Sequence, residues 1–234
     1  MLLQYGADAN VQGGLYGNAL YAASFKGHDE IIHMLLQHRA DANTQGGEYS
    51  NVLQAALSKG HDKIVHMLLQ HRADANVQGG LYGNTLYAAS FKGHDEIVRM
   101  LLQHRADANA QDGQCGNTLY TASSEGHDDI VQILLQHRAD VNAQGGQYGS
   151  ALQAASSEGH VEIVQILLQH RADVNAQGGY YGNALFYCNT EPMSTPKVDS
   201  MAVHCRLPHL KDMTSLYKCF KQKIYVLTTK DLLI

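Results

Sequence analysis

Histidine is the residue type in this sequence whose frequency most suggests chemistry, because the chain contains 14 of them. His28 and His33 are five residues apart, whereas zinc-binding helices of the His-Glu-x-x-His type place two histidines four apart on one face. Five others recur every 33 residues at the ends of expected helices, where an imidazolium complements the helix dipole. They are His38, His71, His104, His137 and His170. We therefore expect no bound metal.

The cysteines and the glycine-rich loops also lack the spacing of zinc-binding and nucleotide-binding motifs. Cys188, His204, Cys205 and Cys219 include none of the close cysteine pairs of zinc modules. The Gly-Gly-Leu-Tyr-Gly loop at residues 13–17 is not followed by Gly-Lys-Ser/Thr, so it does not predict a nucleotide site. No Ser, Cys or carboxylate stands out beside a general base. We expect no enzyme activity and no cofactor.

Charge and composition narrow the class of partner. Residues 1–186 carry 10 Lys and Arg against 18 Asp and Glu, and residues 187–234 carry 7 against 4. Nucleic-acid binding needs clustered Lys and Arg, so this acidic repetitive part argues against it. Residues 1–6 have neither the basic start nor the apolar core typical of a signal peptide, and no apolar run in the sequence is long enough to predict a membrane span. We therefore expect no membrane partner. The four cysteines are not spaced like a disulfide framework, so we expect an intracellular, cytoplasmic protein.

An internal repeat dominates the chain. The tetrad Ala-Asp-(Ala/Val)-Asn recurs at steps of 33 residues, which is the period of a stacked helical repeat. Residues 1–6 then correspond to the end of a truncated preceding unit, and residues 186–234 to a divergent, poorly ordered tail. The predicted array spans residues 7–185, with a partial last unit. The tetrads begin at Ala7, Ala40, Ala73, Ala106, Ala139 and Ala172.

Each unit contains signals for two helices and a loop. An Asn or Ser precedes a short Ala-rich run, where it can cap the first turn, and a Gly ends that run. The following segment, residues 29–37, places Ile31, Ile32, Leu35 and Leu36 on one helical face. Turn residues then predict an extended, hairpin-like finger. Helices this short are marginal alone, so they must stack on their neighbours.

This pattern resembles the ankyrin repeat over residues 1–185, which implies an all-α solenoid of helix-turn-helix units with finger loops. In that family the His after the turn Gly bridges the helix turn, which implies a structural role for His28 and its equivalents. Two departures stand out. The Thr-Pro-Leu-His motif is replaced, which removes a loop-bridging imidazole. The Gly before Ala-Asp is Arg39, Arg72, Arg105, Arg138 and Arg171, and each would cost about 1 kcal/mol if its backbone is left-handed.

Positions that vary between otherwise matching units are candidates for partner contact, because a repeat scaffold stays constant while its binding surface diverges. The finger positions are Leu15, Glu48, Leu81, Gln114 and Gln147. The first-helix positions are Tyr21, Gln54, Tyr87, Tyr120 and Gln153, then Phe25 and Phe91, then Lys26, Lys59, Lys92, Glu125 and Glu158. The last series changes from lysine to glutamate along the array. It predicts a partner whose charges run in the opposite order, from acidic to basic. Neutral drift at exposed sites remains the alternative.

The predicted function is non-enzymatic protein binding, which the resemblance implies, with a protein partner of unknown identity. The sequence motif Gly-Gly-x-Tyr-Gly-Asn-Ala-Leu-x-Ala-Ala is also similar to the repeat arrays of large fungal receptor-like proteins of the NACHT type. That similarity implies the sensor part of a signalling or immune receptor. A truncated or mis-annotated gene fragment without binding activity is the alternative. An enzyme or small-ligand binder would require a convergent polar pocket between units.

Overall fold

The computed structural model describes residues 6–47, 49–79, 83–112, 116–146 and 148–179 of the chain. Several expectations fall outside these ranges. They concern Glu48, Leu81, Gln114 and Gln147 at the finger positions, residues 1–5 of the preceding unit, and the tail at 186–234.

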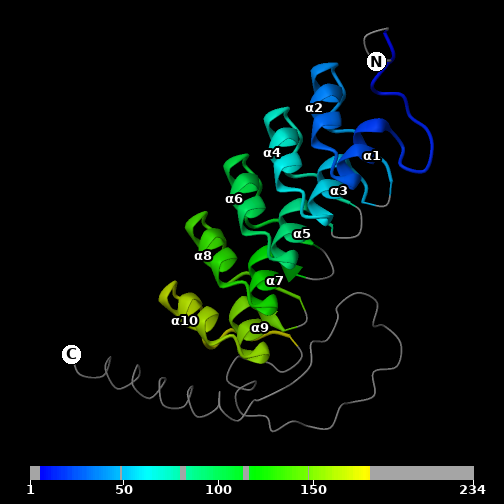
Figure 1. Cartoon of the computed structure of the whole chain (residues 1–234). Helices are drawn as coiled ribbons and strands as arrows, with labels where there is room; N and C mark the ends of the chain where they lie inside the picture. The colour runs from blue at the N-terminus through cyan, green and yellow to red at the C-terminus, as the bar shows by residue number, and fades with distance from the viewer. Residues whose placement is uncertain (1–5, 48, 80–82, 113–115, 147, 180–234) are drawn as a thin grey trace, which may run out of the picture.

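The described residues form ten helices arranged in two rows, as Figure 1 shows. The first helices of the units stand side by side in one row, and the second helices form the other. The first row contains α1 (Ala19–Lys26), α3 (Val52–Ser58), α5 (Thr85–Lys92), α7 (Thr118–Glu125) and α9 (Ala151–Glu158). The second row contains α2 (Asp29–Gln37), α4 (Asp62–Gln70), α6 (Asp95–Gln103), α8 (Asp128–Gln136) and α10 (Val161–Gln169). This two-row stack confirms the expected all-α solenoid.

The predicted caps fix where the first helices begin and end. The Asn51 side chain accepts a hydrogen bond from the Gln54 amide at 2.9 Å, and the equivalent Asn18, Asn84, Asn117 and Ser150 do the same in their units. Such a cap contributes about 1 kcal/mol. At the other end, α1, α5, α7 and α9 are capped by a Gly with a left-handed backbone. Helix α3 ends one residue earlier, at Ser58, with Lys59 as its C-cap and Gly60 at φ 69° after it.

The second helices are amphipathic, and their apolar stripe faces the stack. In α4 all four stripe residues are buried, from Ile64 to Leu69. In α2 the equivalent Ile31 is 44% exposed, against 2% for Ile64, so the expected stripe is incomplete in this unit. Position in the stack explains the difference: the described residues place a preceding unit's second helix beside α4 and none beside α2.

The connectors between units form antiparallel hairpins, as the turn residues predict. Strand β1 (Gln111–Asp112) pairs with β2 (Gly116–Asn117), and β3 (Gln144–Gly145) pairs with β4 (Gly149–Ser150). Isolated bridges join Gln45 to Asn51 and Gln78 to Asn84 in two other fingers. Neighbouring fingers touch through glycines, because a Cβ on Gly145 would lie 3.0 Å from the Gly116 Cα. The fingers therefore form one continuous layer beside the first helices.

The core is built from small residues between first helices and branched residues between second helices. Ala55, Ala56, Ala88 and Ala89 are completely buried, which allows the short first helices to approach closely. The main helix contacts join partners within a unit or in adjacent units, such as α5 with α6 and α7. No helix in the described part of the chain is both long and apolar enough to cross a membrane.

Candidate protein-binding surface

The first-helix series that begins with Tyr21 is buried, so the expectation that it forms an exposed contact surface is wrong. Tyr21 is 1% exposed and Gln153 is completely buried. Gln54, Tyr87 and Tyr120 are also buried. The physical reason is that the next unit's finger folds over this position, which the spacing of residues along one unit does not reveal.

Two of the buried tyrosines hold the fingers that cover them. The Tyr21 hydroxyl accepts a hydrogen bond from the Tyr49 amide at 3.0 Å, and the Tyr120 hydroxyl accepts one from the Tyr148 amide at 3.2 Å. A Cβ on Gly47 would overlap the Tyr21 ring, so the ring lies directly against the finger backbone. A tyrosine therefore bridges one loop to the next where the resemblance led us to expect a missing bridge.

Glutamine makes the equivalent bridge in another unit. The Gln153 Nε2 donates to the carbonyl oxygens of Ala176 at 3.3 Å and Gly178 at 3.2 Å. The sequence signal for this role was the Tyr or Gln at the family's histidine position. At Tyr21, Tyr120 and Gln153 the different residue types therefore support the fingers in different ways.

The exposed part of the first-helix row begins with an aromatic cluster under two lysines. The Phe25 ring centroid lies 5.7 Å from that of Tyr16 and 6.0 Å from that of Tyr49. The Nζ atoms of Lys26 and Lys59 lie 5.5 Å and 4.5 Å from the Phe25 ring centroid. At these distances a cation is attracted to the ring face. Phe25 is half-buried, Leu15 on the first finger is 87% exposed, and both lysines are exposed.

Carboxylates replace lysines at the other end of the same row. The Tyr148 hydroxyl donates a hydrogen bond to Glu158 Oε1 at 2.9 Å. Desolvation and the nearby Glu158 charge raise the pKa of Glu125, although His160 opposes this shift. Burial also raises the pKa of the Tyr148 hydroxyl. Between the two ends, Phe91 stacks on Tyr87 with ring centroids 6.3 Å apart, and Lys92 is half-buried. One row thus runs from cationic to anionic.

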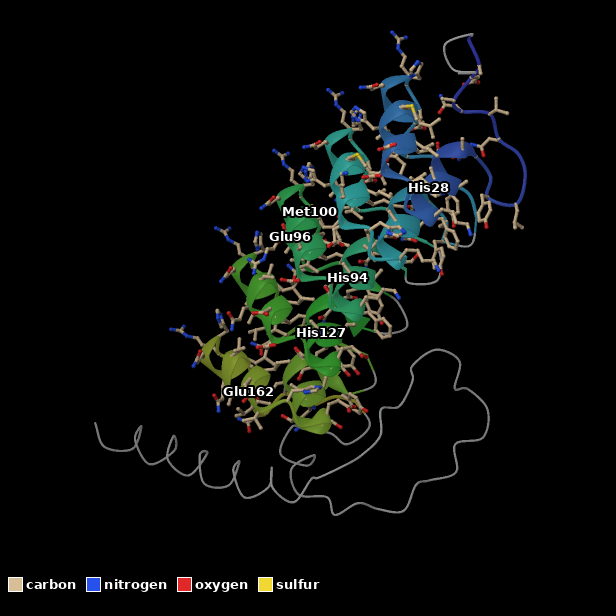
Figure 2. All side chains as sticks on the ribbon, in the orientation of Figure 1. His28, His94, Glu96, Met100, His127 and Glu162 are labelled. Carbon is tan, nitrogen blue, oxygen red and sulfur yellow. The ribbon has the colours of Figure 1, made fainter. Side chains whose placement is uncertain are left out.

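The histidines after the turn glycines join neighbouring units. The Nε2 of His160 lies 3.0 Å from the Ser124 carbonyl oxygen of the preceding unit. A Cβ on Gly126 would lie 2.6 Å from His160 Cε1. In the same way, the His61 ring lies against Gly27 and the His127 ring against Gly93, each in the preceding unit. Figure 2 shows His94 and His127 where the two rows of helices meet. These contacts agree with the structural role that the resemblance implies. The described residues contain no group of three metal-ligating side chains.

The five arginines that replace the family glycine have left-handed backbones, with φ of 64° or 65°. An asparagine of the preceding unit holds each one. The Asn76 side chain donates to the Arg105 carbonyl oxygen at 3.1 Å and accepts from the Asp107 amide at 2.9 Å. Asn10, Asn43, Asn109 and Asn142 make the same pair of bonds in their units. These ten bonds lock the second-helix ends of adjacent units together.

A small hollow of about 190 Å³ lies between two units, where an alternative ligand site would be expected. Its lining is Asn76, Gln78, Asn84, Leu86, Asp107 and Ala110. Asn76 and the Asp107 backbone belong to the clamp between units, and Asn84 caps α5. The polar groups of this hollow therefore act mainly in stacking the units.

The geometry defines the class of protein first: a linear stack of helix pairs and fingers whose exposed row is continuous from unit to unit. A family model of ankyrin repeats matches the chain in three copies, at residues 1–79, 19–112 and 85–178. The chain therefore belongs to the ankyrin repeat family. No curated protein matches it. Ankyrin repeats are in general protein-interaction modules and are typically non-enzymatic.

Proposed function

We propose that this array binds a protein partner along the exposed row of the first helices and fingers. The observation that carries the proposal is that the charge of this row changes from positive at one end to negative at the other. Lys26 and Lys59 lie over the Phe25 ring at the end of the row formed by α1 and α3. Glu125 of α7 and Glu158 of α9 lie at the other end. Half-buried aromatic rings flanked by charges are typical anchors of protein interfaces.

The partner implied by this arrangement carries complementary charges in the opposite order. An acidic and apolar segment fits the end at Phe25 and Leu15, where two ammonium groups and exposed apolar surface lie close together. A basic segment fits the end at Glu125, where a cation would offset the repulsion from Glu158. Matching potentials of this kind fix the register of binding and accelerate association.

The experiment reverses the charge at one end. A partner captured with the array as bait is tested against the double variant Lys26→Glu/Lys59→Glu by stopped-flow association at low salt. We expect the association rate constant to fall about tenfold, with the difference shrinking as salt screens the charges.

The control changes the same net charge on the other row of helices. Lys63 on α4 and Arg99 on α6 are exposed, and the variant Lys63→Glu/Arg99→Glu should leave the rate nearly unchanged. Equal losses in both variants would show that only overall charge matters and would contradict the proposed surface.

We further infer that the surface serves as the sensor part of a larger signalling or immune receptor-like protein. This inference is supported by the similarity of the repeat sequence motif to the repeat arrays of fungal receptor-like proteins. A transcript read across the codon for Phe186 is the direct test. A longer reading frame that restores Gln-Ala-Ala-Ser-x-x-Gly-His would support a larger protein. A transcript ending as this sequence does, in a chain that binds no partner, would favour the gene-fragment alternative.

A further inference from the structure

A row of exposed arginine and histidine side chains follows the ends of the second helices, away from the surface proposed above. Each of α2, α4, α6, α8 and α10 is followed by a His–Arg pair, and all ten side chains are exposed. The pairs are His38–Arg39, His71–Arg72, His104–Arg105, His137–Arg138 and His170–Arg171. The second helices stand side by side (Figure 1), so these repeat-equivalent pairs recur along one edge.

The fold does not require arginine at these positions. Each of the five has φ of 64° or 65°, a conformation that costs a non-glycine residue about 1 kcal/mol. Gly6 occupies the equivalent position one unit earlier, with φ 84°, and shows that glycine meets the same backbone requirement without strain. A residue that is strained and exposed at every turn of a repeat needs a reason other than stability.

The five arginine side chains of this row form no ion pair among the described residues. The salt bridge found among the described residues joins Lys63 to Asp29, and none involves the five arginines. The aspartate two residues after each arginine accepts a hydrogen bond from a backbone amide of its own loop, at 2.9 Å for Asp41 and 2.9 Å for Asp107. Asp74, Asp140 and Asp173 do the same. The guanidinium groups therefore remain open to an external anion.

The backbone that carries the row is rigid. The asparagine clamps fix the carbonyl group of each arginine to the preceding unit, for example Arg72 to Asn43 at 3.2 Å. Ring nitrogens also anchor neighbouring histidines, because the Nδ1 atoms of His38 and His137 each lie 2.9 Å from a carbonyl oxygen of their own helix. A preorganised row of donors loses less entropy on binding than a flexible one.

We propose that this edge is a second docking surface, which binds an extended acidic protein segment. Adjacent packed helices are about 8–10 Å apart, which sets the spacing of the arginines. An extended segment in the polyproline II conformation advances about 3.1 Å per residue with three residues per turn, so a carboxylate at every third residue would face successive guanidinium forks. One arginine about every 8–10 Å matches widely spaced carboxylates better than a nucleic-acid strand, which carries a negative charge about every 3.4 Å.

The test uses the full chain and a synthetic peptide as probe. A fluorescein-labelled 15-residue peptide with Glu at every third position in a Gly/Ser background is titrated at about 50 mM salt, with fluorescence anisotropy as the readout. The five-fold variant carries Arg→Gly at residues 39, 72, 105, 138 and 171. It should bind the peptide at least tenfold more weakly. Glycine suits the left-handed backbone, so its urea midpoint should be no lower than that of the original chain.

Four comparisons decide the outcome. A five-fold Arg→Lys variant should show an intermediate loss, because lysine keeps the charge but lacks the bidentate fork. The variant Lys63→Gln/Arg99→Gln removes two exposed cations from α4 and α6 outside this edge and should bind the peptide like the original chain, and a loss equal to that of the Arg→Gly variant would overturn the second surface. Unchanged binding by a folded Arg→Gly variant would overturn it as well. Tighter binding of a single-stranded RNA of equal charge would overturn the acidic-peptide assignment.

Discussion

At the scale of single residues, one asparagine in each unit does more for the stack than its exposed position suggests. Asn76 reaches 29 residues forward to the Arg105 carbonyl and 31 forward to the Asp107 amide. It therefore satisfies two backbone groups at a helix end where such groups otherwise lack partners. The clamp also explains how a left-handed arginine persists in five successive units. The surrounding structure determines the backbone there, and the residue type adapts to it.

Replacing one central arginine should measure the strain at this position. Arg105→Gly should raise the free energy of unfolding by up to about 1 kcal/mol, because glycine adopts the left-handed backbone without a Cβ penalty. Urea denaturation followed by circular dichroism gives the value.

Arg99→Gly is the matched control, because Arg99 is also exposed but lies inside α6. Glycine in a helix interior should lower the free energy of unfolding by about 1 kcal/mol. A decrease of the same size for Arg105→Gly would show that the arginine is not strained.

At the scale of elements, the turn between the two helices of a unit is fixed by the unit that follows it. Gly126 needs its left-handed backbone at φ 81° to end α7, and it also faces the His160 ring. The same imidazole contacts the Ser124 carbonyl. The turn is therefore constrained twice: by local geometry and by a contact from 34 residues further along the chain.

Gly126→Ala should be strongly destabilising for both reasons. The new Cβ would lie 2.6 Å from His160 Cε1 and would occupy a backbone conformation that favours glycine. We expect the free energy of unfolding to fall by about 2–3 kcal/mol, measured by urea denaturation.

Gly13→Ala provides the comparison, because a Cβ at Gly13 would meet no atom within 4 Å and its φ is not in the left-handed region. That change should be within about 0.5 kcal/mol of zero. Similar losses at both glycines would argue against the His160 contact as the cause.

At the scale of the whole molecule, stability accumulates from neighbour to neighbour. The main contacts link the helices of one unit to each other and to adjacent units, from α1 and α3 through α7 and α9. Fingers follow the same rule, because β2 contacts β3 of the next finger. Such a chain behaves approximately as a one-dimensional sum of units and interfaces. It also presents its exposed rows as continuous lines, which suits extended partners.

Removing one whole unit should therefore leave a folded protein. Deletion of residues 73–105 joins Arg72 to Ala106 and preserves the local Arg-Ala-Asp sequence at the junction. We expect an unchanged helical signal per residue of the array and a lower urea midpoint, since one set of interfaces is lost.

The control deletion removes residues 73–89, about half a repeat, and leaves α6 without the first part of α5. That variant should lose helical signal beyond the deleted residues. If both deletions behave alike, the units are not the stabilising elements that the contacts indicate.

The sequence alone was sufficient for the repeat period, the helix caps, the extent of a second helix and the all-α stack. These features depend on residues within one unit: Asn51 caps a helix that begins beside it, and the apolar stripe of residues 29–37 is visible from helical periodicity. The left-handed arginines could also be anticipated, because a glycine position in a known repeat carries a backbone requirement with it.

Only the tertiary structure decided which variable residues lie at the surface. Phe25 and Lys26 lie at the surface, whereas Tyr21, in the same helix, is covered by a finger that begins in the next unit. The asparagine clamps and the exposure of Ile31 likewise depend on residues about 30 positions away, or on a stack position without a neighbour among the described residues. Local sequence determines each unit's shape, because caps and turns are short-range. Burial is decided by the neighbouring units, because it depends on what packs over a side chain.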